Sequence, residues 1–556
     1  MPTADLIIEN ARVITMDPAR PYAEAIALKD GLVLAVGSRA EVAAAAPAAL
    51  RRINAGGASV LPGFIESHIH LFTGGAQLNS LSLAGLTGFD AIAAAVRQRA
   101  AREPADQLLI AEQAAYFMFG DHEPITRHVL DRVLPDRPLA FFASDHHTMW
   151  ANTPALKLAG ILNGKQVPPG NEIVMGADGL ATGELREFEG FAPVAELTPT
   201  GGREMLGLQG VEPASPPTPA QRAIDKEIIK QGLAYCASLG ITSFHNMDGN
   251  FYQLELLGEI EAAGDLTVRG RVPFRFLPGM ALSELEKAVE MRRRWHSDRL
   301  KADFVKIFMD GVVESTTAHM FADYDTAPGV RGSSYFEQDE FDAICTEIDR
   351  LGFQITVHAI GDAAVNRTLN SYEAAQRANG RRDSRHRIEH IEILAPADLP
   401  RFAGLGVIAS MQPTHAPGGY YPPEPILSMV GRERMRLAYP WQSIRNTGAR
   451  LVFASDWPVA PLDPLLGIKT AVTRGPVFEG APDERQSLAD SIAGFTVDGA
   501  FTEFTEASKG RLRPGLVGDV VILTGDIEAT PPEEIDALKV AVTICGGRIT
   551  YERNAA

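Results

Sequence analysis

Cysteine is scarce in this sequence, and its scarcity excludes one class of protein. Three cysteines occur in 556 residues, at positions 236, 345 and 545. They form no Cys-x-x-Cys pair, and their spacing does not resemble the disulfide framework of a small secreted domain. We therefore expect a reducing compartment and predict a cytoplasmic protein.

Positive charge is also in deficit. The chain has 52 Lys and Arg residues against 70 Asp and Glu residues, a net charge of -18. Proteins that bind nucleic acid use basic surfaces to neutralise backbone phosphates, so this balance argues against a nucleic-acid partner. Solubility is a simpler explanation for the acidic excess.

Long apolar runs are missing as well. No run of about 18 apolar residues occurs, so we expect no membrane-spanning helix. Asp5, Glu9 and Asp17 interrupt the apolar residues near the start, so we expect no signal peptide. Hydrophobic residues make up 45% and charged residues 22%, as in ordinary soluble globular proteins. A chain of 556 residues predicts more than one compact unit.

Both ends of the chain are rich in strand-forming residues. The first 60 residues and about the last 45 contain β-branched runs separated by Asp, Asn and Gly turn signals. Each end alone would leave an unpaired sheet edge and a half-buried face. We therefore predict that residues 1–60 and 510–556 together form one small β-sandwich domain.

The middle of the chain alternates short apolar strands with helix-sized segments, the pattern of parallel βα units. Eight candidate strands lie at residues 63–70, 241–246, 271–277, 304–310, 354–359, 386–390, 406–411 and 451–456. Eight such units predict an α/β fold with a (β/α)₈ TIM barrel across residues 61–509. The first two strands lie much further apart than one helix requires, so we interpret residues 76–230 as an insertion.

Six residues that can carry chemistry lie on five of these strands, mostly at their ends. His68 and His70 are two apart on one strand, so their side chains point to the same side and can chelate a metal such as Zn²⁺. The other four are Lys306, His358, His390 and Asp456. Active sites of TIM barrels lie at the carboxyl ends of the strands, so we expect these residues to converge.

The stretches that contain these residues resemble the amidohydrolase superfamily, in particular its Amidohydrolase-3 group, which includes N-substituted formamide deformylases. The matching stretches cover nearly the whole chain: LPGFIESHIHLF (61–72), DHHTMWANTPAL (145–156), DGLATGELRE (178–187), VKIFMDG (305–311), VHAIGDAAV (357–365), RIEH (387–390), ASDWPV (454–459) and RPGLVGDVVIL (513–523). Their combination is highly specific.

The resemblance implies a binuclear metal centre. His68 and His70 would bind one Zn²⁺, His358 and His390 would bind a second, and Lys306, carboxylated on its amine, would bridge them. Asp456 would contact the first metal and act as the catalytic proton shuttle. A desolvated lysine loses its proton readily and can then capture CO₂. Alternatively, Lys306 stays cationic and pairs with Asp310 or Glu314, and the site holds one metal.

The implied reaction is hydrolysis of a carbonyl C–N bond, in an amide or N-substituted formamide, by a metal-bound hydroxide. Esters, lactams and carbamates need the same attack, so they remain alternative substrates. A non-catalytic metal-binding member of the family is a further alternative. The expected partner is a small amide-like molecule rather than a nucleic acid or a membrane, and a homodimer stays open.

Several further residues are candidates for supporting roles. His147, Trp150 and Asn152 match a family motif in the insertion and are expected to line the substrate pocket, with packing as the alternative. Asp362 is expected to orient His358 as a hydrogen-bond acceptor. Any of three further histidines near strand ends is a candidate to polarise the substrate carbonyl: His245, His319 and His415.

Overall fold

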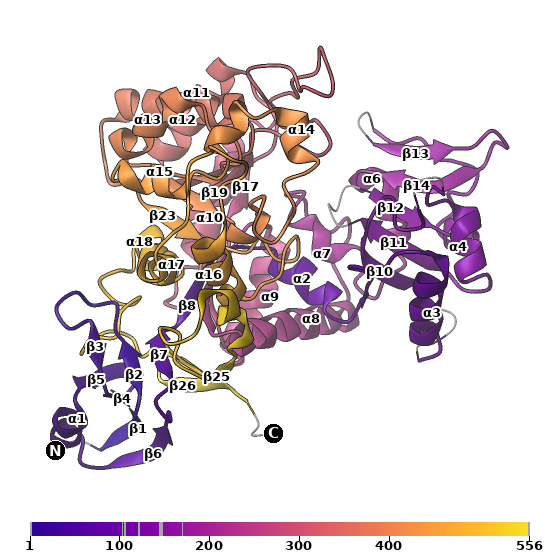
Figure 1. Ribbon diagram of the computed structural model, residues 1–556. Helices are drawn as coiled ribbons and strands as arrows, with labels where there is room; N and C mark the ends of the chain where they lie inside the picture. The colour runs from indigo at the N-terminus through magenta and orange to yellow at the C-terminus, as the bar shows by residue number, and fades with distance from the viewer. Residues whose placement is uncertain are drawn as a thin grey trace. The chain divides into compact units, whose positions relative to one another are not determined.

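The computed structural model describes residues 3–102, 104, 107–120, 123–143, 148–168 and 171–553 (Figure 1). The chain forms two compact units. The first contains residues 1–71, 207–212 and 233–556, and the second contains residues 72–206 and 213–232. Each unit has its own sheets and its own buried apolar side chains.

In the first unit, a strand lies at each of the eight positions predicted for the middle of the chain. These strands are β8 (Phe64–Ile69), β15 (Ile241–Asn246), β16 (Arg269–Arg271) with β17 (Phe274–Arg275), β19 (Phe304–Phe308), β20 (Gln354–Ala359), β21 (Arg387–His390), β22 (Ile408–Met411) and β23 (Leu451–Phe453). The third predicted strand is split in two because Pro273 has no N–H to donate to a neighbouring strand. Nearly all of the residues in these strands are buried, as expected for parallel strands covered on both faces.

The strands pair in parallel in the order of the sequence. One sheet runs β18 (Leu300–Lys301)–β16–β15–β8, and the other runs β17–β19–β20–β21–β22–β23. A parallel bridge between Ile69 and Trp457 joins the segment after β23 to β8. The backbone N–H of Asp456 also donates to the carbonyl of His68, at 2.9 Å. These contacts bring the carboxyl ends of the first and last strands together.

Helices follow most of these strands. The longer ones are α8 (Pro219–Ser238), α9 (Phe251–Ala262), α10 (Leu285–Arg294), α11 (Gln338–Arg350), α12 (Asp362–Asn379) and α16 (Pro464–Thr473). The shorter ones are α13 (Leu399–Leu405), α14 (Ile426–Val430), α15 (Trp441–Asn446), α17 (Leu488–Gly494) and α18 (Val497–Thr502). In α11 the buried residues Phe341, Ile344, Cys345 and Ile348 recur every three or four positions, so one apolar face of the helix turns inward.

Strands from both ends of the chain share one sheet and a core. One sheet has the order β5 (Leu32–Gly37)–β4 (Ala25–Lys29)–β1 (Ala4–Glu9)–β6 (Ala49–Asn54). The other has the order β26 (Arg548–Glu552)–β25 (Val540–Cys545)–β24 (Val520–Leu523)–β7 (Ser59–Pro62)–β2 (Arg12–Ile14)–β3 (Tyr22–Ala23). Leu6 and Ile26 of the first sheet lie in one buried cluster with Val60 and Ile522 of the second. Helix α1 (Arg39–Ala45) begins at a capping box formed by Ser38 and Glu41.

The second unit is built around a six-stranded sheet. Its order is β13 (Glu172–Met175)–β14 (Ala181–Arg186)–β12 (Thr148–Ala151)–β11 (Leu139–Ala143)–β10 (Leu109–Ala114)–β9 (Leu81–Ser82). Its helices are α3 (Phe89–Ala100), α4 (Arg127–Val133), α5 (Thr153–Leu158), α6 (Phe188–Ala195) and α7 (Arg203–Leu206), and α2 (Leu71–Gln77) begins at the boundary. Residues 72–206 and 213–232 thus form a compact unit with a sheet of its own.

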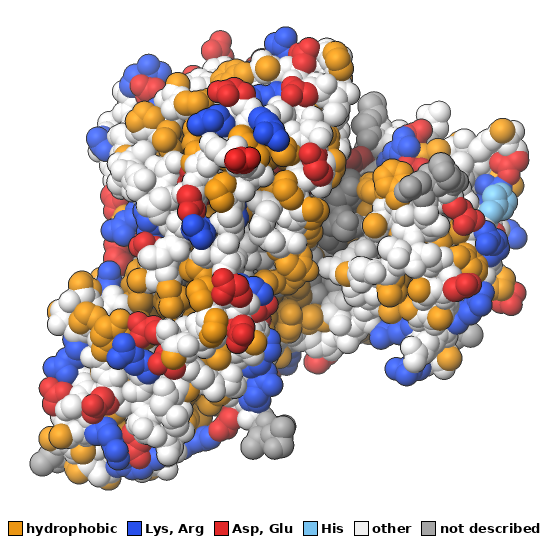
Figure 2. Space-filling model, viewed as in Figure 1, with side chains coloured by type: hydrophobic (Ala, Val, Ile, Leu, Met, Phe, Trp, Pro, Cys, Tyr) orange, Lys and Arg blue, Asp and Glu red, His pale blue; other side chains and the backbone are white. Residues whose placement is uncertain are grey.

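The surface and the cysteines agree with the composition. Acidic and basic side chains are interspersed over the face that Figure 2 shows. Cys236, Cys345 and Cys545 are buried and free. Within the described part of the chain, no helix combines the length and the apolar character needed to cross a membrane.

Candidate metal centre

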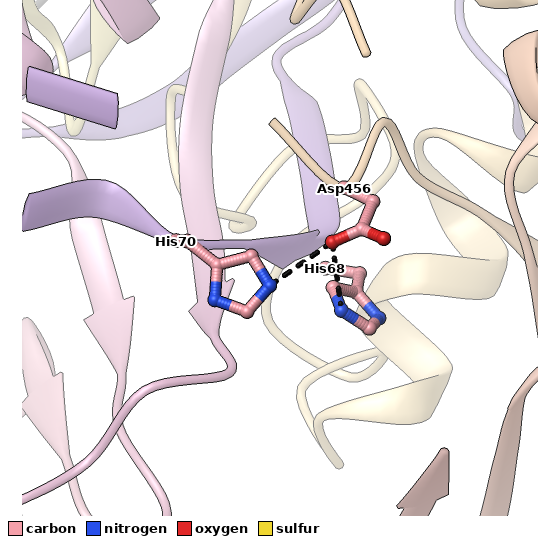
Figure 3. Close-up of side chains that lie close together, drawn as sticks. All are labelled: His68, His70 and Asp456. Carbon is pink, nitrogen blue, oxygen red and sulfur yellow. Dashed lines mark ion pairs between the residues drawn. The ribbon is translucent and has the colours of Figure 1, made fainter. Parts of the chain in front are cut away.

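Three of the predicted ligands meet where β8 and β23 end (Figure 3). The Nε2 atoms of His68 and His70 lie 3.1 and 3.0 Å from the same atom, Oδ1 of Asp456. This oxygen makes no aligned hydrogen bond among the described residues, although both rings face it. Asp456 adopts a φ of 62°, a left-handed conformation that is costly for an aspartate and concentrates at functional sites.

The other predicted ligands adjoin this group. The ring of His390 lies 5.0 Å from that of His68 and 4.5 Å from that of His358, between centroids. Nδ1 of His390 is 4.0 Å from the second oxygen of Asp456. Lys306 is fully buried on β19, and its Nζ has no hydrogen-bond partner among the described residues. The first unit thus gathers four imidazoles, a carboxylate and an unengaged amine.

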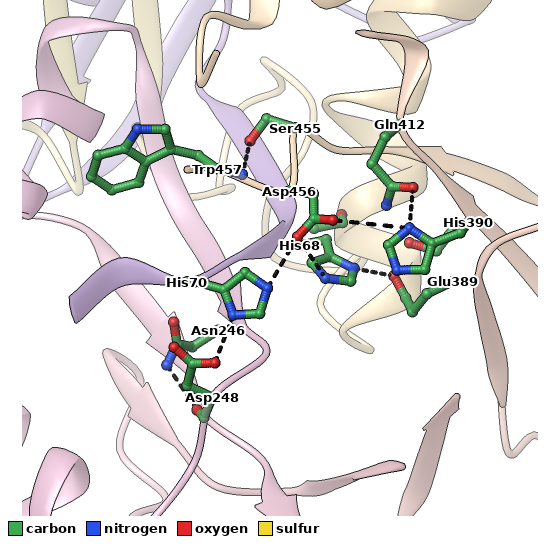
Figure 4. Close-up of polar contacts among 12 residues, drawn as sticks. His68, His70, Asn246, Asp248, Glu389, His390, Gln412, Ser455, Asp456 and Trp457 are labelled. Carbon is green, nitrogen blue, oxygen red and sulfur yellow. Dashed lines mark hydrogen bonds and ion pairs between the residues drawn. The ribbon is translucent and has the colours of Figure 1, made fainter. Parts of the chain in front are cut away.

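In each of the four histidines, one ring nitrogen contacts an acceptor of the protein. Two of these acceptors are carboxylates (Figure 4): Oε2 of Glu389 lies 2.7 Å from Nδ1 of His68, and Oδ1 of Asp248 lies 2.6 Å from Nδ1 of His70. The remaining acceptors are Oε1 of Gln412, 3.0 Å from Nδ1 of His390, and the carbonyl of Gly311, 3.1 Å from Nε2 of His358. Such contacts fix the orientation of a ring, and binding of a metal then requires the opposite nitrogen to lose any proton that it carries.

The charges of the site favour a cation. Burial alone would raise the pKa of Asp456, but His68 and His70 hold it well below its usual range. Burial alone would lower the pKa of His70, but Asp248 and Asp456 raise it to about 10. Burial and the neighbouring Lys306 lower the pKa of His358 to about 3. Two carboxylates thus hold a proton on His70 in a place where a metal could supply the positive charge instead.

Comparison with known proteins identifies the family. The model of the amidohydrolase family matches residues 51–551. The chain belongs to the amidohydrolase family. The resemblance seen in the sequence motifs is therefore confirmed.

Two relatives and one solved structure show how far the similarity extends. This amidohydrolase is 30% identical to Protein LONG AFTER FAR-RED 3 of Arabidopsis thaliana, over 99% of this chain and 92% of that one. It is 25% identical to the N-substituted formamide deformylase of Arthrobacter pascens, over 99% of both chains. Its fold is similar to that of an uncharacterized metal-dependent hydrolase from Pyrococcus horikoshii, with a TM-score of 0.72 and 22% identity, over 95% and 98% of the two chains.

The cationic alternative for Lys306 of this amidohydrolase finds no support at Asp310. The carboxylate of Asp310 accepts hydrogen bonds from three backbone N–H groups, those of His319, Ile360 and Gly361. Burial lowers the pKa of Lys306 to about 7, although the carboxylates of Glu389 and Asp456 oppose the shift. A lysine with this pKa is uncharged much of the time at neutral pH.

Two expectations about supporting residues are wrong. Asp362 does not orient His358, because its carboxylate accepts the backbone N–H groups of Phe321 and Ala363, both at 2.9 Å. His245 is not available to a substrate, because its ring contacts Glu503 at 3.2 Å and Arg387 at 2.9 Å. It belongs to a fully buried ionic network instead.

The described pocket candidates of the insertion are engaged in packing. Asn152 begins α5, and its side chain accepts hydrogen bonds from the N–H groups of Leu139 and Ala155. Its amide nitrogen donates to the carbonyls of Leu134 and Arg137. Trp150 is 2% exposed and lies in a buried apolar cluster. The structure therefore favours the packing alternative for both residues, whereas His147 lies outside the described residues.

Sequence reasoning missed the residues that orient the ligands. Glu389 directly precedes the proposed ligand His390 on β21, and Gln412 directly follows β22. Asp248 follows β15, the strand that contains His245. An acidic or amide residue at the end of a buried strand, or just beyond it, is a sequence signal that points to all three.

Proposed function

We propose that this amidohydrolase is a metal-dependent enzyme that hydrolyses a carbonyl C–N bond in an amide or an N-substituted formamide. The observation that carries the proposal is the convergence of the His68, His70 and Asp456 side chains at the ends of β8 and β23. The likeness to a relative named N-substituted formamide deformylase supports the choice of bond.

The residues present fit a divalent metal. Imidazole nitrogens and a carboxylate are the ligands that Zn²⁺ prefers, and His68, His70 and Asp456 present one such atom each within 4.8 Å of one another. The opposite nitrogen of each of these two rings is held by a carboxylate. We assign a first metal to these three residues and a second to His358 and His390.

Lys306 is proposed to bridge the two metals as a carbamate. Its neutral Nζ would attack the carbon of CO₂ and lose a proton to solvent, which creates an anion with two oxygens. Three features support this step: full burial, a pKa lowered to about 7, and the lack of a hydrogen-bond partner for Nζ among the described residues. A carbamate would replace an unengaged buried amine by a group that two cations can satisfy.

Asp456 is the proposed proton shuttle. When bound, the metals would supply a nucleophilic water of lowered pKa and polarise the substrate carbonyl. The Asp456 carboxylate, already held ionised by its neighbours, would take the proton of the attacking water and return it to the leaving nitrogen. Glu389 and Asp248 would keep the rings of His68 and His70 in one orientation while the proton moves.

We further propose the fold that holds this centre. The parallel order of the eight strands and the bridge from the segment after β23 to β8 support a (β/α)₈ barrel over residues 61–509. The shared core of the two end sheets supports a small β-sandwich from residues 1–60 and 510–556. The compact unit at residues 72–206 and 213–232 would be an insertion after the first barrel strand.

Metal analysis together with a substrate panel tests the function. We expect about two equivalents of zinc in the purified protein, and hydrolysis of an amide or formamide that is lost on chelation and restored by zinc. Asp456→Asn should abolish turnover. Asp362→Asn, a change in a buried carboxylate that accepts the backbone N–H groups of Phe321 and Ala363, should spare metal content. A protein that binds zinc but cleaves no amide, formamide, ester, lactam or carbamate would be a non-catalytic family member.

A further inference from the structure

His415 is a fifth histidine at this centre that the six-residue ligand set leaves out. It ends the short helix η3 (Pro413–His415) directly after β22. A ring nitrogen of His415, one of His390 and a carboxylate oxygen of Asp456 all lie within 4.8 Å of one another. The rings of His415 and His390 are nearly parallel, 11° apart, with centroids separated by 6.2 Å.

His415 differs from the other histidines that were candidates for a substrate contact. The ring of His245 is engaged by Glu503 and Arg387. His319 also has an unengaged nitrogen, but the charges that affect it belong to Arg367 and Glu337, outside the metal centre. The charges that affect His415 belong to Asp456 and His68. Of these three, His415 alone has both an unengaged nitrogen and a place beside the proton shuttle.

The tautomer of His415 determines what it can recognise. The backbone of Ser455 favours the charged form of the ring, as a carbonyl does when it accepts a hydrogen bond from a ring N–H. Nε2 is buried and has no partner among the described residues, which makes Nδ1 the donor in that bond. In the neutral ring Nε2 then carries a lone pair and acts as an acceptor.

We propose that Nε2 of His415 accepts a hydrogen bond from the N–H of the bond to be cleaved, so that the enzyme selects secondary amides and formamides. The inference rests on the proposed function and adds a specificity-determining residue to it. Esters have no such N–H and tertiary amides carry an alkyl group in its place, so both would leave Nε2 unpaired in the complex.

The spacing of His415 and Asp456 suits one substrate nitrogen. In the tetrahedral intermediate this nitrogen would donate its N–H to His415 and receive a proton from Asp456 on its lone pair. Two contacts of about 2.9 Å at a tetrahedral angle span about 4.7 Å. A ring nitrogen of His415 and a carboxylate oxygen of Asp456 lie within 4.8 Å of each other, so both residues can reach one nitrogen. Fixing the N–H in this way would turn the lone pair toward the proton donor.

A matched substrate series on the zinc-loaded enzyme tests the proposal. The probes are N-phenylformamide, N-methyl-N-phenylformamide and phenyl formate. The first has an N–H at the bond to be cleaved, the second has a methyl group in place of the hydrogen, and the third has an oxygen in place of the nitrogen. His415→Phe should lower kcat/KM for N-phenylformamide by about 10- to 100-fold and change the other two less than about threefold. Calorimetric binding of the two formamides should lose its preference for the secondary one, while zinc content stays at the wild-type value.

Two further variants keep the result decisive. His415→Gln places an amide oxygen near the position of Nε2 and should restore part of the preference for the secondary formamide, even if His415→Phe folds poorly. His319→Phe is the matched control, because His319 also has an unengaged nitrogen but lies outside the metal centre. It should leave the preference for the secondary formamide unchanged.

The outcomes separate the inference from the function it rests on. Equal losses on all three probes, or loss of zinc from His415→Phe, would overturn the N–H contact while the hydrolase proposal stands; loss of zinc would make His415 a ligand. A wild-type enzyme that neither binds nor cleaves N-phenylformamide better than its N-methyl counterpart also overturns the N–H contact. Failure to bind zinc would overturn the proposed function itself.

Discussion

The metal centre and the region of the insertion around Asn152 contain the same kind of sequence signal with opposite outcomes. In both, family motifs place polar residues at or near strand ends, and the structure buries them. At the metal centre, Nδ1 of His68 and of His70 contacts a carboxylate while Nε2 of each ring faces Asp456. The buried Nζ of Lys306 has no hydrogen-bond partner among the described residues. In the insertion, the Asn152 side chain makes four hydrogen bonds with the backbone. Burial therefore does not distinguish a ligand from a structural group. The two regions differ because every polar atom of the Asn152 side chain is paired, whereas the Lys306 amine is not.

The difference has an energetic basis. An unpaired buried polar group costs about 1–3 kcal/mol, and an unpaired charge costs more. Asn152 avoids that cost completely, so its place in the motif is explained by the stability of the insertion. Lys306 keeps a buried amine without a hydrogen-bond partner among the described residues, and Oδ1 of Asp456 is shared by two imidazoles without an aligned hydrogen bond. A fold retains such atoms where something else, here the proposed metals, satisfies them.

The largest expected effect on activity is at Lys306 of the metal centre. If its carbamate bridges two metals, Lys306→Ala removes the anion between them, and activity should fall by several orders of magnitude. The space left by the side chain can admit a small carboxylate with the same pair of oxygens. We expect millimolar acetate or propionate to restore part of the activity, with metal content rising in parallel, as measured by mass spectrometry.

Two variants control the rescue. Lys306→Arg fills the space and keeps a positive charge, so carboxylates should not rescue it. Rescue of Lys306→Ala by alkylamines rather than by acids would show that the residue acts as a cation and would exclude the bridge. Full metal content with near-normal activity in Lys306→Ala would remove this residue from the site.

The second largest expected effect is a loss of stability, rather than of activity, when Trp150 of the insertion is replaced. Trp150 packs in a buried cluster, with its ring 5.0 Å from that of Tyr116. Trp150→Ala should lower the free energy of unfolding of its unit by about 3–5 kcal/mol. The kcat/KM of the protein that remains folded should change equally for large and small substrates. A loss that grows with substrate size would restore Trp150 to the substrate pocket.

The sequence predicted more of the centre than of its surroundings for a physical reason. Strands buried on both faces have a simple apolar pattern, so a histidine or aspartate at the end of one stands out. The acceptors Glu389 and Asp248 come from positions 321 and 178 residues away from the histidines they contact, and no local pattern announces such pairs. The split of the third strand at Pro273 could be anticipated from the lack of an N–H, but the compactness of the insertion could not.

Two buried aspartates of the first unit allow a residue that contacts a proposed ligand to be compared with one that does not. Asp248 contacts the ligand His70, whereas Asp362 accepts only backbone N–H groups. Asp248→Asn should weaken metal binding about 10- to 100-fold, because the ring of His70 loses an ionised acceptor. Asp362→Asn is the matched control and should leave metal affinity unchanged. Competition with a fluorescent chelator measures both, and equal losses would contradict the role of Asp248.

The smallest expected effect concerns the proton that a metal would displace. Asp248 and Asp456 raise the pKa of His70 to about 10, so the metal-free ring is protonated at neutral pH. A metal needs the neutral ring, so binding at pH 7 to 9 should release about one proton from His70, and affinity should rise about tenfold per pH unit. Above pH 10 this dependence should end, because the ring is already neutral.

Calorimetry in buffers of different ionisation enthalpy counts the protons, and CO₂-free solutions separate this proton from the one that Lys306 would lose on carbamate formation. Asp248→Asn should reduce the release, since His70 then loses one of the two carboxylates that hold its proton. Metal binding without proton release would mean that His70 is neutral beforehand and that the two carboxylates are balanced by another cation.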